Sequence, residues 1–139
     1  QKLSPEVLVS SEACPMWVPL VENNEYQSEG ADYFIQKHIN QLLAKDPLID
    51  TLILGCTHYP LLIEKIRKYT PSHIRIISQG EYVAASLDDY LMRHPEINDR
   101  CSKNWQCRFL TTESESKFQE SASIFLQEEN IQVESISLG

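Results

Sequence analysis

Short apolar runs alternate with longer amphipathic segments, and this alternation constrains the fold more than any other feature of the chain. Helical spacing of apolar residues predicts helices over residues 31–45, 60–69, 81–94 and about 112–127. Apolar or alternating runs predict strands over residues 7–11, 51–54, 74–77, 106–112 and 131–136. Alternating strands and helices indicate an α/β fold with a mainly parallel sheet.

Composition excludes several classes of protein. An apolar fraction of 42% permits a packed core and argues against disorder. A net charge of -8 argues against a nucleic-acid surface, which needs a basic patch. No apolar run is long enough to span a bilayer, so no membrane partner is expected. The four cysteines match no disulfide framework, and we therefore expect reduced thiols and a cytoplasmic protein.

The stretch "LILGCTHYPLL", Leu52–Leu62, places reactive residues where a strand gives way to a helix. In open α/β sheets, ligands bind beyond the carboxyl ends of the strands. The following helix N-terminus would attract an anion and favour a thiolate. We therefore expect Cys56 to act as a nucleophile or proton acceptor and His58 to orient it or exchange a proton with it. Thr57 offers a hydroxyl and a backbone N–H to a carboxylate.

A structural reading of the same residues stays open. A cysteine after a buried strand is more often a small core residue, and a nearby histidine more often lies at the surface or caps a helix. Cys56 and His58 supply only two ligands, whereas a structural zinc needs four, so no metal is expected. Cys101 and Cys107 are interpreted as structural or surface thiols.

A second cluster, "EACPMWVPLVENNEY", Glu12–Tyr26, also follows a predicted strand. Pro15 and Pro19 stiffen it, and Glu22 is the first acid after an apolar stretch. Glu22 is therefore a candidate site residue. The competing interpretation is a proline-rich loop with a solvated Glu22.

Together, the blocks "ACPMWVPLVE" and "GCTHYPLL" closely resemble the C-terminal half of glutamate racemase, in the aspartate/glutamate racemase superfamily. The segment "FLTTESESKFQESASIFL", Phe109–Leu126, resembles the closing strand and helix of that family. The resemblance covers nearly the whole chain. It implies a parallel-sheet three-layer sandwich of the Asp/Glu racemase type, incomplete in this chain.

The resemblance also implies an activity and a set of site residues. Enzymes of this family interconvert L- and D-glutamate without a cofactor and supply D-glutamate for bacterial peptidoglycan. Two cysteines act on opposite faces of the substrate, and Cys56 matches the one that serves L-glutamate. Thr57 and His58 match substrate contacts, and His58 also assists the cysteine. Glu22 matches an acid that forms hydrogen bonds in the site.

The chain departs from the family in lacking its Asp-Ser-Gly and Ala-Cys-Asn-Thr stretches, the second of which holds the other catalytic cysteine. Cys14 lies in the wrong context to replace it. The chain begins at Gln1 rather than Met, and we expect a truncated or processed product with no racemase activity alone. On the family pattern, residues 1–79 belong to the second α/β domain and residues 80–139 complete the first. We also expect a homodimer.

Two other functions stay open. One is a catalytically dead racemase-like module that binds a small dicarboxylate or a protein partner. The other is an unrelated hydrolase with Cys56 as its nucleophile, although "CTH" matches no known nucleophile elbow.

Overall fold

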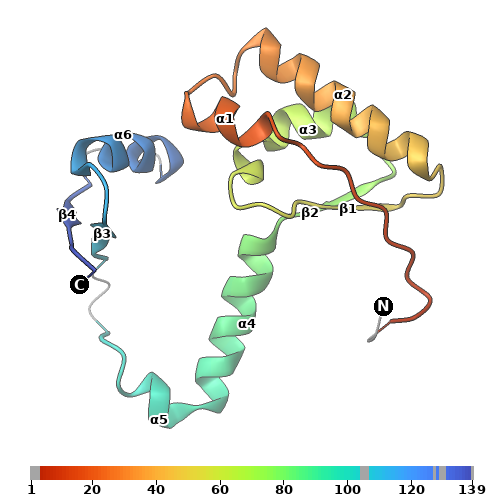
Figure 1. The fold of residues 1–139 in the computed structure, drawn as a ribbon. Helices are drawn as coiled ribbons and strands as arrows, with labels where there is room; N and C mark the ends of the chain where they lie inside the picture. The colour runs from red at the N-terminus through yellow and green to blue at the C-terminus, as the bar shows by residue number, and fades with distance from the viewer. Residues whose placement is uncertain (1–3, 104–106, 127, 129–130, 139) are drawn as a thin grey trace. The chain divides into compact units, whose positions relative to one another are not determined.

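The structure is a computed structural model, and it describes residues 4–103, 107–126, 128 and 131–138. The chain divides into two compact units, Gln1–Ala84 and Ala85–Gly139 (Figure 1). Within the described residues, each unit contains one parallel sheet of two strands, which confirms the predicted α/β class. The assignment of residues 1–79 and 80–139 to two different complete domains stays a prediction. Among the described residues, every helix is too short or too polar to cross a membrane.

The first unit pairs a small sheet with three helices. Its elements are α1 (Trp17–Glu22), α2 (Glu29–Lys45), β1 (Thr51–Ile53), the 3₁₀ turn η1 (Tyr59–Leu62), α3 (Ile63–Tyr69) and β2 (Arg75–Ile77). Strands β1 and β2 run parallel, with Leu52 opposite Ile76. The three helices lie on one side of these strands (Figure 1).

The core of this unit forms where an apolar stripe of α2 meets α1 and α3. Ser28 caps α2, because its side chain accepts a hydrogen bond from the backbone N–H of Ala31. The stripe and its partners bury the side chains of Trp17, Val21, Ala31, Ile35, Ile39, Leu54, Leu62 and Ile66. His38 is buried on the same helix, and burial lowers the pKa of its imidazole.

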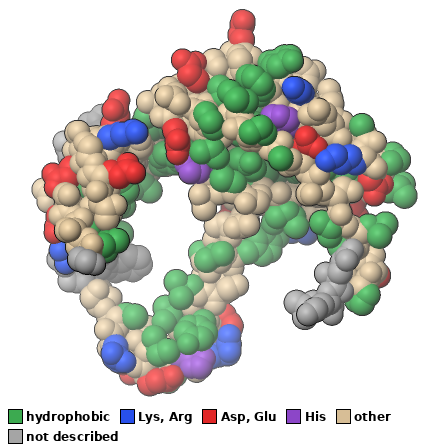
Figure 2. All heavy atoms as spheres, in the orientation of Figure 1, with side chains coloured by type: hydrophobic (Ala, Val, Ile, Leu, Met, Phe, Trp, Pro, Cys, Tyr) green, Lys and Arg blue, Asp and Glu red, His purple; other side chains and the backbone are tan. Residues whose placement is uncertain are grey.

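Helix α4 (Gln79–Arg93) follows β2 and crosses the boundary between the two units. None of its residues is buried. Its amphipathic spacing predicted an apolar face, yet Val83 and Leu87 are more than half exposed. Figure 2 shows hydrophobic side chains at the surface along this helix. The described part of the chain therefore leaves this face uncovered.

The second unit is a strand–helix–strand arrangement preceded by a short helix. Its further elements are α5 (Pro95–Asn98), β3 (Phe109–Thr111), α6 (Glu115–Leu126) and β4 (Val133–Ser135). Helix α6 connects the parallel strands β3 and β4, in which Phe109 lies opposite Val133. A surface ion pair between Arg108 Nη2 and Glu134 Oε2, at 2.8 Å, joins the two strand segments.

Several predicted elements differ from the structure. Residues 7–11, all of them described, form no strand, and Leu8 is 81% exposed. A strand needs a hydrogen-bonded neighbour, and in the described part of the chain β1 and β2 pair only with each other. The helix predicted over residues 60–69 opens with the 3₁₀ turn η1, and the strand predicted over 106–112 is limited to β3. Residue 106 lies outside the described residues, as does residue 127 of the last predicted helix.

Candidate functional site

The candidate site is built on the turn between β1 and η1, which holds Cys56, Thr57 and His58. The backbone N–H of Leu54 donates to the carbonyl of Ile77 at 3.0 Å, so the pairing with the β2 segment continues just past β1. At the other end, the N–H of Tyr59 donates to the carbonyl of Cys56 at 3.2 Å. The turn is thus fixed on both sides at the carboxyl end of a parallel strand, where α/β proteins bind ligands.

Cys56 and His58 contact each other within this turn. The sulfur of Cys56 lies 3.7 Å from Nδ1 of His58, within hydrogen-bonding distance for a thiol. Both side chains are half-buried. A proton can therefore pass between the sulfur and the imidazole without movement of the backbone.

Glu22 reaches the same imidazole from a different segment. Its Oε1 lies 3.5 Å from Nε2 of His58, an ion pair when the imidazole is protonated. Glu22 is the last residue of α1, and Trp17 and Val21 anchor that helix in the core. The structure thus brings Glu22, Cys56 and His58 together, although sequence alone placed Glu22 in a separate cluster.

The helical conformation of α1 corrects the alternative of a proline-rich loop. Pro19 falls in the first turn of the helix, where a missing N–H removes no intrahelical hydrogen bond. The proline therefore does not prevent the helix. The carboxylate of Glu22 is nevertheless exposed, with 60% of its side chain accessible to solvent.

The three side chains can act as a relay for one proton. A carboxylate near Nε2 favours the histidine tautomer that carries its proton there. Nδ1 is then an unprotonated acceptor facing the sulfur. In that tautomer His58 can take the thiol proton and leave a thiolate, and the resulting imidazolium lies beside a negative charge.

Thr57 lies between Cys56 and His58 in the turn, and its side chain is exposed. Its hydroxyl is therefore open to a ligand from solvent. The expected support from a helix N-terminus is weaker than the sequence predicted. The residues after the turn form η1, only four residues long, and α3 begins later at Ile63.

Tyr59 is a neighbour of the site that the sequence patterns did not single out. Its ring packs edge-on against Trp17, with centroids 4.8 Å apart. Burial, followed by the adjacent sulfurs of Cys14 and Cys56, raises the pKa of its hydroxyl. The one available signal was its position immediately after the "CTH" motif.

Cys14 lies near Tyr59 and is held as a thiol. Burial, then the charge of Glu12, raises its pKa to about 11, although a hydrogen bond with Tyr59 opposes the shift. A sulfur with this pKa is a poor base at neutral pH. Cys14 is therefore unsuited to accept a proton at neutral pH.

No family model matches the chain. It is 36% identical over 135 residues to a glutamate racemase of Lactiplantibacillus plantarum, covering 97% of this chain and 49% of that protein. It is 39% identical over 139 residues to a glutamate racemase of Streptococcus pyogenes, covering 99% of this chain and 51% of that protein. The chain spans about half the length of the curated relatives it matches.

The chain is also similar to solved structures of glutamate racemases. Glutamate racemase isoform RacE1 from Bacillus anthracis matches with a TM-score of 0.84 and 34% identity, over 99% of this chain and 50% of that one. A glutamate racemase from Francisella tularensis in complex with D-glutamate matches with a TM-score of 0.82 and 26% identity, over 98% of this chain and 50% of that one. The described α/β chain therefore fits an incomplete Asp/Glu racemase fold.

Proposed function

We propose that this chain, a homologue of glutamate racemases that spans about half of their length, carries one of the two proton-transferring thiols of an isomerase that interconverts L- and D-glutamate. The similarity to glutamate racemases over nearly the whole chain supports the reaction class. The Francisella structure, described as a complex with D-glutamate, supports glutamate as the substrate. The observation that carries the proposal is that Glu22, at the end of α1, meets the Cys56–His58 pair of the turn.

The reaction needs two bases because inversion requires the proton to leave from one face of the α-carbon and return on the other. On this proposal the Cys56 thiolate takes the α-proton of L-glutamate and becomes a thiol. A second thiol, outside this chain, gives its proton to the opposite face and becomes a thiolate. No cofactor takes part, and each turnover exchanges the protonation states of the two sulfurs.

His58 and Glu22 prepare Cys56 for this step. Nδ1 of His58, 3.7 Å from the sulfur, accepts the thiol proton before substrate is deprotonated. Glu22, 3.5 Å from Nε2, holds the imidazole in the required tautomer and balances the charge that the imidazole acquires. His58 thus takes the proton from the sulfur, while Glu22 acts through His58.

Thr57 provides a contact for the substrate carboxylate. Its exposed side chain sits between the two proton-transfer residues, so a carboxylate bound there would bring the α-carbon close to Cys56. Hydrogen bonds at this carboxylate would also stabilise the negative charge that develops when the α-proton leaves.

Residues 1–79 form part of one α/β domain and residues 80–139 complete another, each needing strands from the remaining half of a racemase. Two-stranded sheets are marginal alone, and both sheets here have two strands. The uncovered apolar face of α4 also fits a chain that lacks a partner surface. We therefore expect this chain to be inactive alone and to associate with a second copy as a homodimer.

The cell biology follows from the family. Similarity to bacterial glutamate racemases supports a cytoplasmic isomerase whose D-glutamate enters peptidoglycan and so maintains cell shape. Neither a nucleic acid nor a membrane is needed as a partner for this role.

A chimera tests the proposal. This chain replaces the matching half of the Bacillus anthracis enzyme, and circular dichroism follows the loss of optical activity of L- or D-glutamate. We expect inversion by the chimera and none by the 139-residue chain alone. A folded chimera without inversion, or inversion by the chain alone, would contradict the proposal. A chimera that binds glutamate without inverting it would favour a catalytically dead module.

A further inference from the structure

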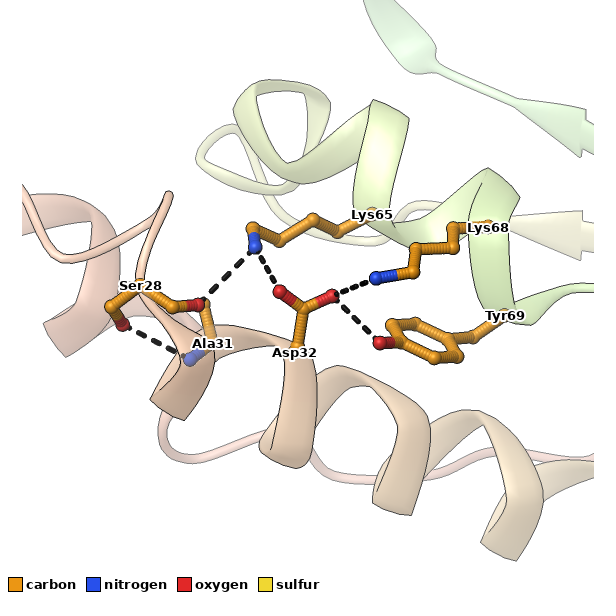
Figure 3. Close-up of polar contacts among 6 residues, drawn as sticks. All are labelled: Ser28, Ala31, Asp32, Lys65, Lys68 and Tyr69. Carbon is orange, nitrogen blue, oxygen red and sulfur yellow. Dashed lines mark hydrogen bonds and ion pairs between the residues drawn. The ribbon is translucent and has the colours of Figure 1, made fainter.

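Helices α2 and α3 are joined by a set of polar contacts that we call the Asp32 cluster, made of Ser28, Asp32, Lys65, Lys68 and Tyr69 (Figure 3). Nζ of Lys65 donates to the Asp32 carboxylate and, at 3.2 Å, to the carbonyl of Ser28. The Tyr69 hydroxyl donates to Asp32 at 2.7 Å, and Nζ of Lys68 donates to it at 2.9 Å. Three donors from α3 therefore converge on one carboxylate of α2.

The members of the cluster differ in their access to solvent. The side chain of Lys65 is 13% exposed and that of Asp32 is 23% exposed, whereas that of Lys68 is 60% exposed. Exposed ion pairs are screened by water and contribute little, while sheltered pairs with full hydrogen bonding hold their geometry. The Asp32–Lys65 pair is therefore the rigid part of the cluster.

The cluster joins the same two chain segments that the site joins. Asp32 lies in the first turn of α2, and a short turn connects α2 to Glu22 at the end of α1. Lys65 lies in the first turn of α3, which continues η1 and the turn that holds His58. The His58–Glu22 contact and the Asp32–Lys65 pair thus bridge one pair of segments at two points.

We propose that Asp32 and Lys65 are positioning residues that hold Glu22, at the end of α1, within reach of His58. The His58–Glu22 contact is long, at 3.5 Å, and its carboxylate is largely exposed, so it cannot fix the two segments by itself. A sheltered pair elsewhere between the same segments can do so. This inference rests on the proposed role of His58 toward Cys56.

The competing explanation is that the cluster only stabilises the packing of α2 on α3. Those helices already share a core in which Ile35 and Ile66 are fully buried. Variants of the polar pair should therefore retain the fold, and a change at Cys56 in a folded variant would not follow from a purely stabilising role.

The experiment measures alkylation of Cys56 by iodoacetamide from pH 6 to 10 in the full chain, resolved by mass spectrometry of the Cys56 peptide. We expect Asp32→Asn and Lys65→Met each to slow the reaction at pH 7 by about threefold or more, toward the profile of His58→Ala. Lys65→Arg, which keeps the donors, should retain the wild-type profile.

Matched controls separate positioning from general loss of an ion pair. Lys68→Met removes the exposed arm of the same cluster, and Glu134→Gln removes the Arg108–Glu134 pair of the other unit. In both variants the rate of Cys56 alkylation at each pH should stay within about 1.5-fold of the wild-type rate. Cys101, which is exposed, serves as an internal reference for reagent concentration.

Wild-type profiles in folded Asp32→Asn and Lys65→Met chains would overturn the inference. So would loss of far-ultraviolet circular dichroism in both variants, because the pair would then act in folding, and so would a His58→Ala profile equal to the wild type. The measurement needs no glutamate. An inactive chimera with the expected alkylation pattern would therefore reject the proposed function and leave the positioning role intact.

Discussion

Glu22 and His58 face each other across two segments that are distant in the sequence, with Oε1 of the carboxylate 3.5 Å from Nε2 of the imidazole. This contact turns a local Cys56–His58 pair into an array of three groups. In such an array the outer carboxylate should matter less than the imidazole, and the imidazole less than the sulfur. The order can be measured in the chimera described above.

Replacement of Cys56 by alanine in the chimera should abolish glutamate inversion. Positioned proton transfer contributes about 10²–10⁴-fold to rate, and loss of one of two bases removes that contribution entirely for one face of the substrate. Polarimetry or circular dichroism, started from each enantiomer of glutamate, measures the rate of inversion. Cys101→Ala is the control, because Cys101 is an exposed thiol in the other unit. Full-rate inversion by Cys56→Ala would contradict the assignment.

Replacement of Glu22 by glutamine should lower kcat by at most about fivefold, because an exposed ion pair contributes about 0.2–1 kcal/mol. Replacement of His58 by alanine should cost more, because the sulfur loses its proton acceptor. Steady-state rates of the two chimeras test the order. A larger loss for Glu22→Gln than for His58→Ala would show that Glu22 does not act through the imidazole.

Cys14 should react slowly with iodoacetamide up to about pH 9 and faster toward pH 11, because its pKa is raised to about 11. Burial is the larger cause and the charge of Glu12 the next. Glu12→Gln should therefore move the rise in rate to lower pH without restoring an ordinary thiol. Mass spectrometry of the Cys14 peptide gives the rate.

The same shift predicts a change in stability. The folded state retains the Cys14 proton to a higher pH than the unfolded state, whose thiol titrates near its ordinary value of 9.0. Between about pH 9 and 11 the unfolded chain binds fewer protons, so the free energy of unfolding falls as pH rises. Cys14→Ala should reduce this fall in thermal melts, and an unchanged slope would show that Cys14 is not shielded as described.

Asp32 should make the chain sensitive to acid. Its hydrogen bond with Lys65, followed by those with Tyr69 and Lys68, holds the pKa of its carboxyl well below its usual range. As the pH falls, the Asp32 carboxyl therefore binds a proton at a higher pH in the unfolded chain than in the folded chain. The stabilisation is present above the ordinary pKa of 3.8 and is lost as pH falls below it.

Thermal melts between pH 2 and 7 test this dependence. Below about pH 4, the melting temperature should fall less steeply with decreasing pH in Asp32→Asn than in the wild type. Asp89→Asn is the matched control, because Asp89 pairs with Arg93 on the exposed surface of α4, where ion pairs contribute little. Equal acid dependence of the wild type and Asp32→Asn would contradict the assignment.

Local patterns in the sequence were sufficient for most elements of the fold. The stripe of Ile35, Ile39 and Leu42 has strict helical spacing, and α2 follows it. The run at Thr51–Ile53 and the run at Arg75–Ile77 form the parallel pair that alternation with helices predicts. The Cys56–His58 contact also followed from sequence, because only one residue separates the two.

Contacts between distant segments were not predictable in the same way. The strand predicted over residues 7–11 was wrong, since a strand depends on a neighbour that composition cannot show. The approach of Glu22 to His58 depends on how α1 packs, and the Asp32–Lys65 pair has no local spacing to reveal it. Resemblance to a family identified Glu22 as a candidate, but no pattern indicated Asp32.

The exposed apolar face of α4 should make the chain self-associate. Val83 is 63% exposed and Leu87 is 55% exposed, on a helix without a buried residue. Packing of a second copy of the chain against this face would bury its apolar side chains away from water. Light scattering should therefore give a dimer or larger species, and Leu87→Glu should shift it toward monomer. Ser86→Glu adds the same charge one position away and should have less effect, whereas a wild-type monomer at working concentration would contradict the prediction.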